Sequence, residues 1–474
     1  MARFIINAPR WLLLVALVYA PWAYGSTRPW AISGLDGLLG AVLVSWLLSY
    51  LLRQQWPSVH PVLGVAALGL VAQAWFMVVN AKYEYDTQVH EFITLTPLLS
   101  WAPGSLHRAL SQENATQLSA MLVAVCVVCE ISRSWLWRKR LLLTMALAGT
   151  SVVVLGLAQK FTNASAVFWG PEDMGKTFFA TWRYHANAGA FMNLVWPIVA
   201  SFAALTFLRK STAWQKVCWT AALVFCLAGV MANTSRAAGA LGLLSAGLWG
   251  GWLVYQMVRG RFSGFSPATT TVTALLLISL VISVAALAGL DTTLKRWSQI
   301  GDQVTADNSR LLAAEVCLDM APKAGAWGFG PGTFRTAFPY FTQGYGKSIE
   351  GTWLYAHEDY LQTLVEWGWV GASLWAVVMF GGLVSSLARA FRHRQKLSSS
   401  VRVSHFALIV GLLGVLLHAL VDFPLQIASI QLYVAVVVGL LWGSRHWLSA
   451  PKTERRSRST AGRDAFHRVP LFSS

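Results

Sequence analysis

The sequence predicts an all-α membrane protein whose chain crosses the bilayer about twelve times. Of its 474 residues, 55% are hydrophobic and only 12% are charged, about half the charged fraction of an ordinary soluble protein. Runs of roughly 20 apolar residues, the length that a helix needs to cross a bilayer, recur along the whole chain. This composition excludes disordered, collagen-like and disulfide-stabilised proteins.

Twelve apolar runs are the candidate membrane spans. The first contains Pro21 and resembles a signal peptide, but bulky Trp22 and Tyr24 stand near its end and a second run follows closely, so we expect an uncleaved span. Only the residues from Asn233 to Arg236 separate the seventh run from the eighth, which predicts a tight hairpin. In order, the spans are expected near 9–26, 30–52, 61–80, 114–131, 141–159, 187–208, 217–233, 237–258, 270–290, 367–388, 403–422 and 426–447.

The distribution of lysine and arginine predicts the orientation of these spans. Connections on the cytoplasmic side of a polytopic protein retain these residues. With a cytoplasmic N-terminus, most of the 37 lysines and arginines fall in inner connections, such as 133–140, 209–216 and 389–402. The sequence therefore predicts N-in, C-in topology. The formal net charge of +17 is explained by this orientation, and no nucleic-acid partner is expected.

The predicted outer side carries three sizeable connections, near 81–113, 160–186 and 291–366. The last is expected to be a long helical extracytoplasmic loop before span ten, because the stretch from Arg310 to Met320 has helical character and Asn308 or Ser309 can cap it. We expect one transmembrane domain over 1–448, which includes this loop, and a basic, disordered cytoplasmic tail over 449–474. Functional polar groups should then gather on the outer face.

Two other signals point away from nucleotide and metal chemistry. The segment Gly170 to Thr177 fits the phosphate-loop pattern, but it lacks the strand–helix context, and Glu172 and Asp173 would repel phosphates. The five cysteines lack zinc-ligand spacing, and no outer loop carries an Asp-x-Asp pair. We therefore expect neither a metal nor another cofactor.

Two arginines stand out on the outer side. Arg236 lies at the mouth of the hairpin between two apolar spans, where a charge is costly and is functional by default. It can reach lipid headgroups, cap the next helix, or bind a phosphate with its planar set of donors. Arg310 begins the helical stretch of the long loop, where a single arginine is usually solvated. Asp36 and Glu130 lie within spans two and four, and we assign them no role.

Other polar groups precede or follow spans on the same side. His357, just before span ten, can act as a general base near neutral pH, or it can bond a loop carbonyl. Its neighbour Glu358 can orient the ring or face water. Asp422 ends span eleven and can pair with one of these Arg or His groups, while Arg183 and His185 stand just before span six. Loops far apart in the sequence thus bring Arg or His to one side of the membrane.

The pattern resembles the O-antigen ligase and O-antigen polymerase superfamily of bacterial envelope glycosyltransferases. One departure is Glu358, where that family often has Asn after the loop histidine. The five stretches that carry the resemblance, in the order of the family, are Tyr184–Ala190, Asn233–Ala238, Arg310 with Gly328–Gly332, Ala356–Leu361 with Glu366–Gly368, and Leu420–Pro424.

The resemblance implies glycan transfer on the periplasmic face of the inner membrane. The donor would be a glycan on a polyprenyl diphosphate, and the acceptor a sugar hydroxyl, as on lipid A–core. Arg236 and Arg310 would bind the diphosphate, Arg183 would support them, and His357 would be the base. Asp422, Glu358 and His185 remain possible supporting residues. Preorganised guanidiniums can stabilise a leaving diphosphate without a metal, and a single displacement predicts inversion at the donor sugar.

Several alternatives stay open at this point. A ligase, a polymerase that extends a second lipid-linked repeat, and an enzyme that glycosylates protein Ser or Thr differ mainly in the acceptor; overall resemblance favours the ligase. A transporter or lipid flippase would place charged residues near mid-membrane and at broken helices, whereas the charges here gather at one face. An inactive scaffold would not explain why energetically costly Arg and His groups gather on the outer face.

Overall fold

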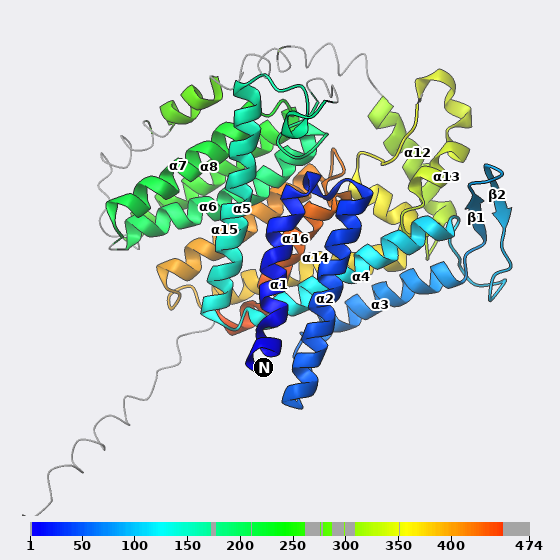
Figure 1. The fold of residues 1–474 in the computed structure, drawn as a ribbon, viewed down its shortest axis with the longest axis horizontal. Coiled ribbons are helices and arrows are strands. Elements are labelled where there is room, and N and C mark those ends of the chain that lie inside the picture. The colour runs from blue at the N-terminus through cyan, green and yellow to red at the C-terminus, as the bar shows by residue number, and fades with distance from the viewer. Residues whose placement is uncertain are drawn as a thin grey trace, which may run out of the picture.

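Long apolar helices make up most of the chain, and their order follows the predicted spans (Figure 1). The structure is a computed structural model that describes residues 2–171, 177–209, 211–260, 275, 278–286, 298, 309–349 and 351–448. Eleven helices in these residues are long and apolar enough to cross a membrane. They are α1 (Ala2–Trp22), α2 (Pro29–Arg53), α3 (Pro61–Val79), α4 (Arg108–Ile131), α5 (Trp135–Phe161), α6 (His185–Leu208), α7 (Ala213–Ala232), α8 (Arg236–Val258), α14 (Asp359–Arg392), α15 (Ser399–His418) and α16 (Ala428–Trp442), the last of which continues into a 3₁₀ turn so that its span reaches His446.

Three expectations fall wholly or mostly outside the described residues. These are the ninth span at 270–290, the tail at 449–474 and most of the rejected phosphate-loop segment. The expected all-α fold is confirmed over the described chain.

Helix starts follow local signals, and this explains where the predicted boundaries were wrong. Proline occupies the first position of α2 and α3, where its missing N–H costs nothing. Helix α14 begins at Asp359, eight residues before the predicted apolar run at 367, because the Glu358 carboxylate accepts a hydrogen bond from Leu361 N and caps a polar first turn. Helix α15 ends at His418, so Asp422 lies in the following turn and not at the end of a span.

Helix α16 lies at the centre of the bundle. It packs against α4, α14 and α1, and 89% of its apolar window is buried inside the protein, compared with 33% for α2 and for α7. Tyr433 of α16 is fully buried, and its hydroxyl donates to Leu17 O of α1 at 3.0 Å. The lipid-facing helices therefore surround a central pair formed by α16 and the similarly buried α6.

The connections gather at two ends of the bundle. The long-loop face comprises residues 81–107, 178–184, 309–358 and 419–427, which contact one another through bonds such as Leu106 N to Phe329 O at 3.0 Å. The basic face comprises residues 54–60, 132–134, 393–398 and 443–448, joined by bonds such as Arg445 Nη2 to Ser58 O at 3.4 Å. The start of α1 lies away from the long-loop elements (Figure 1). The predicted inner and outer connections thus separate as expected.

The long-loop face carries its own small elements. Strands β1 (Tyr83–Asp86) and β2 (Glu91–Thr94) form an antiparallel hairpin that the sequence did not predict. The predicted helical loop contains α12 (Ser309–Ala324) and α13 (Phe334–Phe341), which share a small apolar core. Short 3₁₀ turns are η1 (Tyr24–Ser26), η2 (Val167–Trp169), η3 (Gln343–Ser348), η4 (Pro424–Gln426) and η5 (Gly443–His446).

A backbone clasp between residues 325–334 and α14 fixes the start of that helix. Gly368 has φ +62° and interrupts the helical geometry of α14. Beside it, Phe329 N donates to Val365 O and Val370 N donates to Ala326 O, each at 3.0 Å. The buried Glu366 carboxylate accepts bonds from the backbone N–H groups of two clasp residues. The glycine-rich stretch therefore docks the long loop onto the helix that follows it.

Candidate functional site

His357 sits in a sharp turn immediately before α14. Its φ is +54°, a left-handed conformation that few residues other than glycine, asparagine and aspartate adopt. The turn is held on both sides, because Ala356 N donates to Gln362 Oε1 at 3.0 Å and Glu358 caps the helix. This geometry turns the imidazole away from α14 and toward the α15–α16 connection.

Asp422 is the partner of this imidazole. His357 Nδ1 lies 3.1 Å from Asp422 Oδ1, and the carboxylate is only 5% exposed, whereas the imidazole is 23% exposed. Burial raises the pKa of Asp422, but the hydrogen bond from His357 and the charges of His357, His418 and Arg310 outweigh burial and hold this pKa below its ordinary value. In the neutral tautomer with the proton on Nδ1, His357 donates to Asp422 Oδ1 and leaves the Nε2 lone pair to accept a proton.

Tyr184 connects this pair to Arg310. The Tyr184 hydroxyl donates to Asp422 Oδ2 at 3.0 Å and accepts from Arg310 Nη2 at 3.2 Å. Burial raises the pKa of Tyr184 to about 12, and the charge of Asp422 adds to this shift, so the phenol stays neutral and can donate. The resulting chain Arg310–Tyr184–Asp422–His357 joins residues from α12 and from the segments before α6, after α15 and before α14.

Aromatic rings form one wall of the site. Phe423 stacks on Tyr184 with a centroid distance of 5.5 Å and on Tyr355 at 4.4 Å. The His357 ring stands edge-on to Phe423 at 4.8 Å and to Trp353 at 5.7 Å. These contacts fix the orientation of the imidazole and keep water from one side of it.

Arg236 approaches the same end of α6 from another direction. It is the first residue of α8, directly after the N-cap Ser235, and its side chain is half-buried. The hairpin that carries it is tied to α6, because Asn233 Nδ2 donates to His185 O at 2.8 Å. His185 directly follows Tyr184, so Arg236 lies in the same region.

The remaining predicted site residues are placed less centrally. Arg183 is exposed, although Trp182 beside it is buried. His185 Nδ1 lies 3.1 Å from Thr177 O. Burial raises the pKa of Glu358, and its carboxylate caps α14, so Asp422 and not Glu358 contacts the imidazole.

Sequence reasoning missed Tyr184 as a site residue. Its only signal was its place at the start of the motif Tyr184–Ala190.

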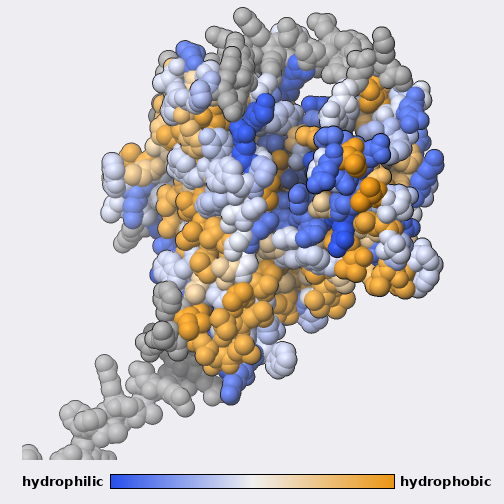
Figure 2. Space-filling view, turned by 45° about the vertical axis from the view of Figure 1, so that its right-hand side comes forward, coloured by the Kyte–Doolittle hydropathy of each residue, from blue (hydrophilic) through white to orange (hydrophobic). Residues whose placement is uncertain are grey.

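A surface view shows hydrophilic side chains lining a hollow above a surface that is mostly hydrophobic (Figure 2). In the described part of the chain, no group of three or more His, Cys, Asp or Glu side chains has the arrangement of a metal site.

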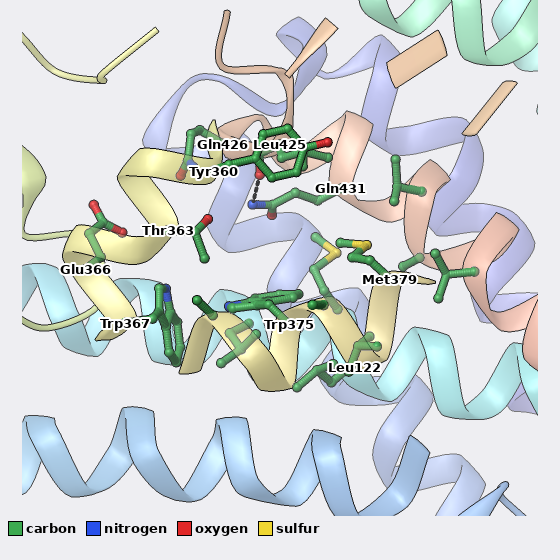
Figure 3. Close-up of a pocket in the computed structure, with 18 of the residues that line it drawn as sticks. Leu122, Tyr360, Thr363, Glu366, Trp367, Trp375, Met379, Leu425, Gln426 and Gln431 are labelled. Carbon is green, nitrogen blue, oxygen red and sulfur yellow. Dashed lines mark hydrogen bonds between the residues drawn. The ribbon is translucent and has the colours of Figure 1, made fainter. Parts of the chain in front are cut away.

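An apolar cavity of about 330 Å³ lies behind the start of α14 (Figure 3). Helices α4, α14 and α16 line it, with residues such as Leu122, Trp375 and Met379 at its apolar end. Polar groups, among them Thr363 and Gln431, line the part nearer the long-loop face. Gln426 lines the end of the cavity nearest the site. Its Nε2 donates to Oδ1 of Asp359, two residues after His357, at 2.9 Å.

Part of the chain matches a known protein family. Residues 221–376 match the family model described as O-antigen ligase, and this confirms the resemblance to the O-antigen ligase and polymerase superfamily. No curated protein matches the chain. The matched segment covers about a third of the chain and contains Arg236, Arg310 and His357, whereas Tyr184 and Asp422 lie outside it.

Proposed function

We propose, from the premise of the O-antigen ligase match, that this membrane protein transfers a glycan from a polyprenyl-diphosphate donor to an acceptor hydroxyl. The reaction would occur at the long-loop face, which we assign to the periplasmic side of the bacterial inner membrane. The single observation that supports this most is the chain Arg310–Tyr184–Asp422–His357. It places a histidine with an available Nε2 and an arginine in one hydrogen-bonded unit.

His357 acts as the general base in this proposal. As the acceptor oxygen attacks the anomeric carbon of the donor sugar, His357 Nε2 takes the proton of the hydroxyl. The bond between that carbon and the diphosphate oxygen breaks, and its electron pair leaves with the lipid diphosphate. Asp422 stabilises the imidazolium that forms, as a buried carboxylate does for other histidine bases. One displacement of this kind inverts the anomeric configuration.

Arg310 and Arg236 bind the leaving diphosphate. The Tyr184 hydroxyl accepts from Arg310 Nη2, and the exposed Arg310 guanidinium has the donor geometry that binds phosphate oxygens. Arg236 begins α8, so the positive end of the helix dipole adds to its charge. The exposed Arg183 supports them. Preorganised cations of this kind stabilise charge that develops in the transition state.

The cavity between α4, α14 and α16 receives part of the lipid chain in this proposal. Its lining is mainly hydrocarbon, and it lies within the membrane-spanning helices. Its polar end approaches the turn that carries His357, so a chain bound there would keep its diphosphate near the site. We take lipid A–core as the acceptor, with a second lipid-linked repeat or a protein hydroxyl as the alternatives within the superfamily.

Transfer from a radiolabelled lipid-linked glycan in proteoliposomes tests the proposal. His357→Asn keeps a residue that tolerates the left-handed turn but removes the base, and we expect a loss of roughly 10²–10⁴ in rate. Arg310→Gln should cost roughly 10²–10³. Lys323→Gln, at an exposed position of the same helix α12, is the matched control and should retain activity. Translocation of the lipid without covalent transfer would instead indicate a flippase.

The acceptor is tested by deletion and electrophoresis of surface polysaccharide. A ligase deletion should remove the polysaccharide ladder from lipid A while polymer accumulates on the carrier lipid. A polymerase deletion should leave lipid A capped with single repeats, and that result would replace the ligase assignment.

A further inference from the structure

Two arginines on the basic face share the same hydrogen-bond acceptors. Arg133 follows α4 and Arg445 lies in η5, far apart in the sequence. Arg133 Nε and Arg445 Nε both point at His446 Nε2, at 3.3 and 3.0 Å. Their Nη2 atoms both donate to Ser58 O, at 3.3 and 3.4 Å. The fold therefore holds two like charges side by side, and we call Arg133 and Arg445 the arginine pair.

The partners of the arginine pair are neutral. The Ser58 carbonyl, the Ser58 hydroxyl and an unprotonated His446 nitrogen accept its hydrogen bonds, and none of them carries a charge that would cancel those of the arginines. Within the described residues, no carboxylate lies at ion-pair distance from either guanidinium. Glu130 is the acidic residue closest to Arg133 in the sequence, but its carboxylate accepts a hydrogen bond from Trp46 Nε1 at 2.8 Å and does not pair with Arg133. Two uncompensated cations held together repel each other, so this arrangement favours an anion as a further partner.

Other cations extend the positive region around the pair. Arg138 Nη1 donates to Arg133 O at 3.4 Å. Arg389 has a buried Nε for which the described part of the chain provides no hydrogen-bond partner. Burial lowers the pKa of His60, and the charges of Arg445 and Arg389 lower it further. The positive region therefore continues toward α14.

The surroundings of the pair suit a lipid headgroup. Arg133 is exposed and Arg445 is half-buried, so an anion can reach them. Ser58 belongs to the connection after α2, in which Trp56 is 91% exposed, and Leu51 in the last turn of α2 is 72% exposed. Exposed Trp and Leu at the end of a membrane helix are expected where lipid covers the protein, so a phosphate bound here would carry acyl chains that contact the protein.

We propose that Arg133 and Arg445 bind the phosphate of an anionic glycerophospholipid at the basic face. This site lies at the opposite end of the bundle from His357, and it does not depend on the glycosyltransferase assignment. Guanidinium groups suit phosphate because their fixed donors match its oxygens, and basic pockets between membrane helices bind anionic headgroups in this way. The lipid would neutralise the pair and join the ends of α4 and α16 to the α2–α3 connection.

Thermal unfolding of the full chain in a neutral detergent tests the site. Added phosphatidylglycerol should raise the melting temperature, whereas phosphatidylcholine and inorganic phosphate should not. In the double variant Arg133→Gln, Arg445→Gln, we expect affinity for phosphatidylglycerol to fall about 30-fold, from the usual contribution of two basic residues near a membrane. The control Arg392→Gln, Arg394→Gln removes the same charge at exposed positions of the same face and should respond as the wild type does.

The other outcomes overturn the proposal. If both double variants lost the same affinity for phosphatidylglycerol, the lipid would respond to general surface charge and not to the arginine pair. If inorganic phosphate raised the melting temperature as much as phosphatidylglycerol does, the site would bind free anions and not a lipid. If the double variant does not fold, native mass spectra of the wild type decide the matter. Retention of phosphatidylglycerol in excess of phosphatidylcholine supports the site, and equal retention excludes it.

Discussion

At the scale of single residues, the site depends on Tyr184 as much as on the residues that the motifs suggest. Its hydroxyl is both the acceptor for Arg310 and a donor to Asp422. In the proposed reaction it is a positioning residue, because it acts through the arginine and the carboxylate. A tyrosine before a membrane helix is usually an interface residue, so its sequence position alone did not reveal this role.

Tyr184→Phe should lower kcat/KM for glycan transfer by roughly 150-fold or more. The substitution removes hydrogen bonds to two charged groups, which are worth about 1.5–3 kcal/mol each. The KM for the lipid donor should rise because Arg310 loses its anchor, while the ring contact with Phe423 remains and the melting temperature changes little. Steady-state kinetics and thermal unfolding measure both effects. A large loss of stability with unchanged KM would show a purely structural role.

Asp422→Asn should change the dependence of stability on pH. The folded-state pKa of Asp422 lies below its ordinary value of 3.8, so its stabilising contribution is present above the unfolded-state pKa and is lost as the pH falls through the folded-state value. The melting temperature of the variant should therefore fall furthest below that of the wild type at neutral pH, and the gap should narrow below about pH 4. If the difference in melting temperature stayed constant down to pH 3, the pKa of Asp422 would not be lowered in the folded protein.

At the scale of elements, the sequence predicts the helices well and their polar ends less well. Spans such as α3 and α8 were predicted to within one or two residues because an apolar run and its first turn coincide there. Helix α14 was predicted too short because its first turns are polar and are stabilised by the Glu358 cap and the clasp, not by lipid. The β1–β2 hairpin, which has eight strand residues in total, gave too short a pattern to detect.

Gly368→Ala should destabilise the clasp. The backbone angles φ +62° and ψ −173° of Gly368 cost a residue with a side chain about 1–3 kcal/mol, and a Cβ at this position would lie 2.4 Å from the carbonyl carbon of Ala326. We expect a lower melting temperature and lower transfer activity, since the clasp fixes the turn that carries His357. Gly247→Ala in α8 is the control, because its Cβ would meet open space. If both variants melt at the wild-type temperature, the clasp does not support the fold.

Ala376→Phe should narrow the cavity between α4, α14 and α16. Displacing one or two methylenes of a bound lipid chain costs about 0.8 kcal/mol each, which corresponds to a rise of roughly 4- to 15-fold in KM for a long-chain donor. A donor analogue with a short chain should be unaffected. Val384→Phe adds similar bulk on the exposed side of the same helix and serves as the control. If the substitution raised the KM equally for long-chain and short-chain donors, the cavity would not bind the lipid chain.

At the scale of the whole molecule, the separation of the two faces was predictable, whereas the convergence of the site was not. The positions of lysine and arginine along the chain indicate which connections share a side. They do not indicate which connections touch, because contact depends on how α6, α14 and α15 pack around α16. The pairing of His357 with Asp422 remained one of several options in the sequence for this reason.

The predicted N-in, C-in topology can be tested with single cysteines in a background that lacks the native ones. Gln88→Cys lies between β1 and β2, and Gln395→Cys lies in the α14–α15 connection of the basic face; both positions are exposed. In intact spheroplasts, a membrane-impermeant maleimide should label the first and reach the second only after permeabilisation. The reverse pattern would place the proposed active site in the cytoplasm.

The central place of α16 has a consequence for biosynthesis. This helix is the last membrane span in the described chain, yet it fills the middle of the bundle and follows the turn that supplies Asp422. A ribosome must therefore translate nearly the whole polypeptide before either the interior or the Asp–His pair can be completed. A chain that stops before α16 would lack both at once, so neither the buried interior nor the candidate site could form in it.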